Sequence, residues 1–166
     1  MLLTAVVIHS AVARESSSRQ LILSLALVPL TRILSLSMPL ANIPQIWWYV
    51  IIYVPLFAAG ATVAYVLGYR PADIGFTFNF RLLPVYLAIA MTGILFGVAE
   101  YFILSPIPLV MDFSWQSIWL PALIFLSTTG FVEEFTFRGV LQCTAVQRFG
   151  WWRGVIYVSV LFAILH

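Results

Sequence analysis

Long apolar runs separated by short polar stretches dominate this chain of 166 residues. Three of the runs are about as long as the roughly 20 residues that a helix needs to cross a bilayer, namely residues 21–40, 46–69 and 82–104. A further run begins at Trp115 and continues toward Gly150, and a last one ends at His166. Because the runs are continuous and lack the period-two alternation of barrel strands, they predict membrane helices.

Polar residues, prolines and glycines predict where these helices are connected. We expect loops or turns at residues 13–20, 41–45, 70–81 and 105–114. Pro29 predicts a bend inside the span at 21–40, since proline removes a backbone hydrogen bond. Gly150 has the position of a helix stop and predicts a helical hairpin over residues 115–166.

The first 12 residues are apolar but too short to cross the bilayer as a helix. A signal peptide is one alternative, with Ala11-Val12-Ala13 resembling a cleavage site. Such a signal needs a basic residue before its apolar run, and none is present here. We therefore favour a truncated first helix.

The composition supports a membrane protein. Hydrophobic residues make up 63% of the chain and charged residues only 8%, whereas a soluble domain has about 25% charged residues. We therefore predict an all-α, polytopic integral membrane bundle of five to six transmembrane helices, with membrane lipid as its surroundings and residues 1–166 as one partial domain. A net charge of +2 gives no indication of a nucleic-acid partner, and a single cysteine, Cys143, excludes an internal disulfide.

The arginines predict the orientation of the bundle. Six of the eight fall in alternate loops, at 13–20, at 70–81 and near residue 150, while the loops at 41–45 and 105–114 contain no basic residue. By the positive-inside rule, we expect the arginine-bearing loops to be cytoplasmic.

Four ionisable residues stand inside the last two apolar runs: Glu133, Glu134, Arg138 and His166. An ionisable residue within a membrane segment marks a candidate functional site, because the bilayer cannot solvate its charge. Glu134 and Arg138 are four residues apart and are predicted to form an ion pair, whereas Glu133 points in another direction along the helix.

The predicted hairpin would bring Glu133 level with His166. The two residues are almost equally far from Gly150 in sequence, and each lies about 25 Å along its helix from the turn. Phe162 precedes His166 by one helical turn. An acid and an imidazole would thus meet at one depth.

This combination favours water activation. A desolvated carboxylate is a suitable general base near neutral pH, and an imidazole would orient the water, transfer a proton or bind a metal. The bond attacked would be an acyl bond, most naturally a peptide amide. Glu133 and His166 would be the ligands if a divalent metal is used, but two ligands are fewer than the three of a typical catalytic zinc site. No metal site is therefore assigned.

Each of these residues also has a purely structural explanation. Glu134 and Arg138 would then lock two helices together, and His166 would be a packed histidine. Arg32 is expected to extend to the interface or to pair with a carboxylate, with a substrate contact as the alternative. Glu100 is expected to lie in the interfacial zone.

The quoted residues resemble the CPBP intramembrane proteases, a family that includes type II CAAX prenyl endopeptidases and bacterial relatives linked to bacteriocin processing, self-immunity and abortive infection. The resemblance rests on Glu133-Glu134-x-x-x-Arg138 followed by Phe162-x-x-x-His166, on Phe137-Arg138-Gly139, and on the loop from Pro71 to Phe76. It covers about residues 115–166, with weaker agreement upstream.

The resemblance implies a helical bundle of a bacterial plasma membrane with a cavity open to membrane and cytosol. Glu133 would activate the water and His166 would help to position it, with Glu134 and Arg138 as the supporting acid and base and with Phe137 and Phe162 as supporting residues. The substrate would be a peptide or a prenylated peptide. Both a metal-dependent mechanism and a metal-free glutamate mechanism have been put forward for this family.

The family has a third motif on a later helix, a histidine followed four residues later by Asn or Asp. This sequence stops at His166, so we expect an N-terminal fragment that is inactive alone. Two other functions stay open: a non-catalytic membrane protein for bacteriocin immunity or partner binding, and a small transporter subunit that uses the carboxylates as proton or cation sites.

Overall fold

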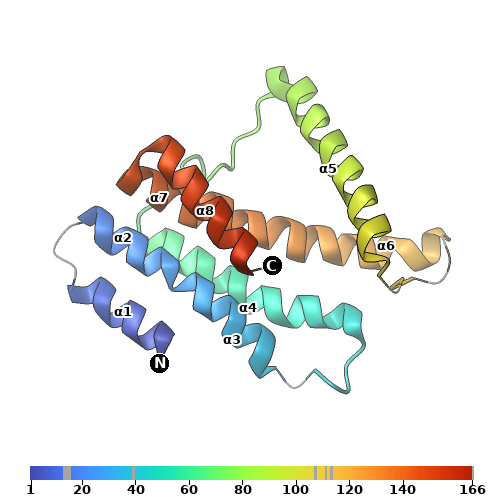
Figure 1. Ribbon diagram of the computed structural model, residues 1–166, viewed down its shortest axis with the longest axis horizontal. Helices are drawn as coiled ribbons and strands as arrows, with labels where there is room; N and C mark the ends of the chain where they lie inside the picture. Colours follow the sequence, from blue (N-terminus) through green and yellow to red (C-terminus); the bar gives the residue numbers. More distant parts are fainter. Residues whose placement is uncertain (13–15, 39, 107, 111, 113, 166) are drawn as a thin grey trace. The chain divides into compact units, whose positions relative to one another are not determined.

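The computed structural model describes residues 1–12, 16–38, 40–106, 108–110, 112 and 114–165. These residues form six continuous helices and no strand, so the predicted all-α class is confirmed. Three helices are uninterrupted: α1 (Leu2–Val12), α4 (Gln45–Val66) and α8 (Trp151–Leu165). The other three consist of α2 (Ser16–Leu25) with α3 (Leu27–Ser37), η1 (Phe80–Leu82) with α5 (Leu83–Leu104), and α6 (Trp115–Phe125) with η2 (Leu126–Leu141) and α7 (Gln142–Phe149) (Figure 1).

Four of the six helices are long and apolar enough to cross a membrane: Ser16–Ser37, Gln45–Val66, Phe80–Leu104 and Trp115–Phe149. Two apolar helices, at Leu2–Ala11 and Trp151–Leu165, are shorter. These lengths identify an integral membrane protein, with four helices of spanning length in the described part of the chain where five to six were predicted. The side of the membrane on which the arginine-bearing loops lie stays a prediction.

The chain divides into two compact units. One contains residues 1–76 and 120–166, and the other contains residues 77–119. The second unit is built around α5, in which no residue is buried. All the candidate site residues belong to the first unit, which is described below.

The first long helix is bent where proline predicts it. α2 ends at Leu25 and α3 begins at Leu27, because Pro29 has no N–H to donate to the carbonyl of Leu25. The predicted loop at 13–20 is wrong from Ser16 onward, where the chain is already helical. Its serines form the first turn, since a membrane helix can extend past the hydrocarbon into the polar interface and serine is favoured at helix starts.

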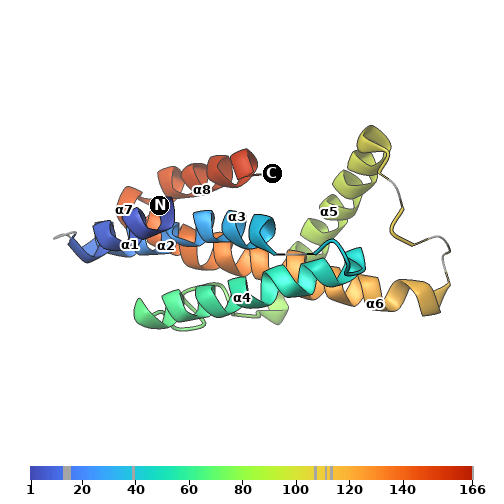
Figure 2. The same cartoon turned by 90° about the horizontal axis from the view of Figure 1, so that it is seen from below.

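Two buried clusters hold the first unit together, and η2 contributes to both. The helix η2 packs against α2, α4 and α8, an arrangement that can be followed in Figure 2. One cluster joins η2 and α7 to α2 and α8, and consists of Leu21, Phe137, Leu141, Ala145 and Val158. The other joins η2 to α3 and α4, and consists of Leu27, Ala64, Phe135 and Val140.

The segment that carries the acidic motif is wound as a π-helix, not as the α-helix that the sequence predicts. Its hydrogen bonds run from i to i+5, so residues five apart share a face. Phe135 and Val140 have this spacing and lie in one cluster, while Phe137 and Leu141 lie in the other. Neighbouring residues of η2 thus pack against two different sets of helices. π-helical winding is rare, and its single-turn form is frequent at functional sites.

The predicted hairpin is present. α7 ends at Phe149, Gly150 has a positive φ of 83°, and α8 begins at Trp151. A side chain at Gly154 would begin 2.6 Å from the backbone nitrogen of Val146, so the two helices touch backbone to backbone. Glycine is required at this contact. The close approach of the two backbones fixes how α8 lies along α7 and η2.

Candidate active site

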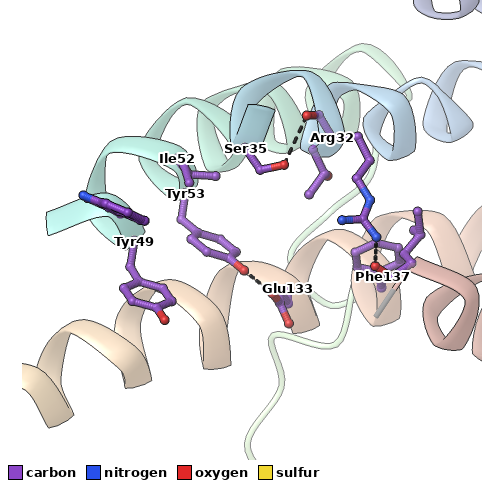
Figure 3. Close-up of a pocket in the computed structure, with 10 residues that line it drawn as sticks. Arg32, Ser35, Tyr49, Ile52, Tyr53, Glu133 and Phe137 are labelled. Atoms are coloured by element: carbon purple, nitrogen blue, oxygen red, sulfur yellow. Dashed lines mark hydrogen bonds between the residues drawn. The ribbon is translucent and has the colours of Figure 1, made fainter. Parts of the chain in front are cut away.

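Glu133 lies on a cavity of about 330 Å³ inside the first unit. The side chain is half-buried, on the π-helical segment η2. Four helices contribute to the lining (Figure 3), which consists of Thr31, Arg32 and Ser35 from α3, Trp48, Tyr49, Ile52 and Tyr53 from α4, Glu133 and Phe137 from η2, and Leu165 from α8.

Tyr53 holds the carboxylate of Glu133. Its hydroxyl group donates a hydrogen bond to Oε1 of Glu133, and Figure 3 shows the ring reaching from α4 to η2. One turn before it on α4, Tyr49 packs edge to face on Phe125, with the ring centroids 4.5 Å apart. The contact fixes α4 against the helix that carries Glu133. The arrangement thus orients one carboxylate oxygen through a neutral donor.

Arg32 contributes a cation to the same cavity. Its guanidinium group donates to the backbone carbonyl of Leu165 on α8, and the hydroxyl of Ser35 donates to the carbonyl oxygen of Arg32 at 3.1 Å. In Figure 3 the Arg32 side chain extends from α3 toward Phe137. The Arg32 side chain is exposed and lines this cavity, and its extension to the membrane interface stays a prediction.

Glu134 and Arg138 form the predicted ion pair, with 3.6 Å between Oε2 of Glu134 and Nε of Arg138. Both side chains are more than half exposed, at 60% and 54%, so the pair contributes little to stability. It lines a different pocket from Glu133, together with Ile74, Gly75 and Phe76. The structure thus separates the two adjacent glutamates, as their predicted directions require.

The loop before α5 packs against this second pocket. The carbonyl oxygen of Ile74 lies 3.1 Å from the Cβ position at Gly139, an approach that a larger residue would disturb. Phe76 contacts Phe131 and Phe135, with centroid distances of 5.6 and 5.8 Å. The family-like loop therefore lies beside the Glu134–Arg138 pair.

A second contact ties the start of this loop to α7. The hydroxyl of Tyr69 donates to Oε1 of Gln147 at 3.1 Å. Burial raises the pKa of the Tyr69 hydroxyl, because an ionised phenolate loses hydration there. The hydroxyl stays protonated near neutral pH and keeps its role as the donor.

Phe137 and Phe162 confirm the alignment of the hairpin helices. Their rings meet edge to face, with centroids 5.1 Å apart. Phe137 follows Glu133 by four residues, so the contact lies about one helical turn from Glu133. His166 itself lies outside the described residues. Leu165, the residue before it, lines the cavity of Glu133.

One comparison with known proteins matches the part of the chain that contains Glu133. Residues 114–166 match the family model of type II CAAX prenyl endopeptidases, Rce1-like. This segment is similar to that family. The comparisons with curated proteins and with solved structures gave no significant match.

The Rce1-like segment contains Glu133, Glu134, Phe137, Arg138 and the whole of α8. The opposite wall of the cavity comes from α3 and α4, which lie outside the matched residues. Arg32 and Tyr53 therefore belong to the part of the site that the family match does not cover.

The described residues do not fit a catalytic metal site. Within 1–165, excepting the undescribed positions, no three His, Cys, Asp or Glu side chains come together. Glu133 contributes one carboxylate where a catalytic zinc usually has three protein ligands. We therefore derive no step through a metal.

Sequence reasoning did not find Tyr53. Helix α4 is apolar along almost its whole length, so its pattern does not show which side faces η2. The available signal was the phenolic hydroxyl itself, since a polar group in the middle of a span needs a partner.

Proposed function

We propose that the protein is an intramembrane endopeptidase in which Glu133 activates a water molecule for attack on a peptide bond close to the membrane. One observation carries the proposal: the Rce1-like segment presents Glu133 on a cavity within the membrane helices, with Tyr53 hydrogen-bonded to one carboxylate oxygen. The matched family is described by endopeptidase activity on prenylated CAAX proteins. No comparison supports a role in bacteriocin immunity.

In this mechanism Glu133 accepts a proton from water while the water oxygen attacks the carbon of the scissile amide. The C–N bond then breaks, and the same proton passes to the leaving nitrogen. Tyr53 orients the carboxylate through its hydrogen bond to Oε1. The apolar walls of the cavity restrict the number of competing water molecules.

The other predicted residues have supporting roles in this proposal. His166 positions the water, the role that the resemblance implies for it. Glu134 and Arg138 hold η2 against the loop at 74–76 through the second pocket. Phe137 and Phe162 set the distance between η2 and α8.

Cleavage by the natural protein in liposomes tests the proposal. The substrates are a fluorogenic prenylated peptide with a CAAX-type end and the same peptide without the prenyl group. We expect Glu133→Gln to lower kcat by at least about 100-fold, the usual contribution of a general base. Glu100→Gln, in the second unit, is the matched control and should retain wild-type activity.

Cleavage that is equal in the two variants would remove Glu133 from the reaction. An absence of cleavage of both peptides by the wild-type protein would contradict the proposed substrate class.

A further inference from the structure

A further pocket lies where one membrane helix begins and another ends. α2 begins at Ser16 and α4 ends at Val66, and both belong to helices of spanning length. The pocket has a volume of about 220 Å³ and shares no described lining residue with the cavity of Glu133. Because the ends of two spanning helices form it, it lies at a membrane boundary. Its lining consists of Ser16, Arg19, Gln20 and Leu23 from α2 and of Val66 and Leu67 from the end of α4.

The lining changes from polar to apolar along α2. Ser16, Arg19, Gln20 and Leu23 are three or four residues apart in sequence, so they share one face of the helix. From Ser16 to Leu23 this face extends for about 10 Å along the helix axis. A phospholipid changes from its phosphate to its hydrocarbon chains over a comparable depth of the bilayer. The pocket and the lipid therefore have the same order of polarity.

The polar end of the pocket suits a phosphate group. The guanidinium group of Arg19, the amide of Gln20 and the hydroxyl of Ser16 all carry donors for phosphate oxygens. Arg19 is the one ionisable residue in the described lining, and its side chain is exposed to a ligand that arrives from the bilayer. The opposite end is apolar, and Val66 there is 63% exposed.

We propose that this pocket binds an anionic phospholipid. Arg19 and Gln20 hold the phosphate of the headgroup, and one acyl chain lies along Leu23, Val66 and Leu67. Basic pockets between membrane helices bind anionic headgroups on the cytoplasmic side, where the leaflet carries negative charge. The arginine-bearing segment at 13–20 is predicted to lie on that side. The inference goes beyond the proposed peptidase and does not depend on it.

Two features bear on the choice of ligand. Glu15, four residues before Arg19, lies outside the described residues. A guanidinium group has five N–H donors, so Arg19 has donors for a phosphate even where a carboxylate also binds it. A free phosphate ion has no part that fits the apolar end of the pocket, which favours the lipid.

Native mass spectrometry of the full chain in a neutral detergent tests the inference. The protein is titrated with phosphatidylglycerol and with phosphatidylcholine of identical acyl chains, and Kd is measured for the first bound lipid. We expect phosphatidylglycerol to bind about fivefold more tightly, the usual contribution of one arginine near a membrane surface. Inorganic phosphate should not displace it.

Four variants locate the site. Arg19→Gln should abolish the preference and leave the affinity for phosphatidylcholine unchanged, which also shows that the variant is folded. Arg19→Lys should retain the preference, because lysine binds phosphate as a point charge. Val66→Ser should weaken the binding of both lipids about threefold, since an apolar contact is lost. Arg81→Gln, at an exposed arginine of the second unit, is the matched control and should behave as the natural protein.

Equal affinity for the two lipids, or a preference that survives Arg19→Gln, would overturn the inference. A preference that Arg81→Gln abolishes as well would show a general attraction to basic surface in place of a site. Unchanged binding of both lipids to Val66→Ser would remove the acyl chain from the pocket. Displacement of the lipid by inorganic phosphate would assign the pocket to the free ion instead.

Discussion

At the scale of single residues, the site consists of a carboxylate that a tyrosine orients and an arginine that lines the same cavity. Tyr53 orients Glu133 by a hydrogen bond, and Arg32 faces the same cavity from α3. Neither contact was predicted. Glu133, Glu134 and Arg138 were found from sequence because charge in an apolar run is conspicuous, whereas a tyrosine in such a run resembles any interfacial aromatic.

The hydrogen bond from Tyr53 gives a prediction at this scale. Tyr53→Phe should lower kcat about tenfold and leave KM unchanged, because the ring still fills the space while the carboxylate loses its donor. Steady-state kinetics in liposomes measure both constants. Tyr65→Phe, on the exposed side of α4, is the control and should match the wild type. An unchanged kcat, or a change in KM alone, would show that Tyr53 does not position Glu133.

At the scale of elements, the sequence predicted the features that local chemistry determines. Pro29 bends the first long helix, and Gly150 ends α7. The π-helical winding of η2 was not predictable, because a run that is apolar on most sides does not show whether residues four or five apart share a face. The helical start at Ser16 was missed because polarity at a membrane boundary marks the interface as well as a loop.

The contact between α7 and α8 gives a prediction for the hairpin. Gly154→Ala should destabilise the protein by about 1–3 kcal/mol, the usual cost of overpacking, since the added Cβ would meet the backbone of Val146 at 2.6 Å. Gly93→Ala, where no described atom lies within 4 Å, is the matched control and should not destabilise. Unfolding in mixed micelles measures the free energy of unfolding of both variants. Equal stability of the two variants would show that the hairpin is not packed as described.

At the scale of the whole molecule, the all-α membrane class followed from composition and from the length of the apolar runs. The assembly of the cavity could not be predicted from composition or from the length of the runs. Its walls come from helices far apart in sequence, and two uniformly apolar helices carry no signal of which faces meet. The hairpin was an exception, because its short turn forces neighbouring helices to run antiparallel.

The alternation of arginines predicts the orientation of the molecule. With Cys143 replaced by Ala, a new cysteine at Asn42 should react with an impermeant maleimide in intact cells, and one at Asp73 should react only after lysis. The reverse pattern, or equal labelling of both positions, would contradict the cytoplasmic assignment of the loop at 70–81.

The central claim is that water, activated by Glu133, cuts the peptide. Single-turnover cleavage in ¹⁸O-labelled water, followed by mass spectrometry of the new C-terminus, tests it most directly. We expect one solvent oxygen in the product of the first turnover, and no product from Glu133→Gln. An unlabelled first product would mean that a protein group attacks the bond in place of water, and labelled product from Glu133→Gln would mean that another residue activates the water.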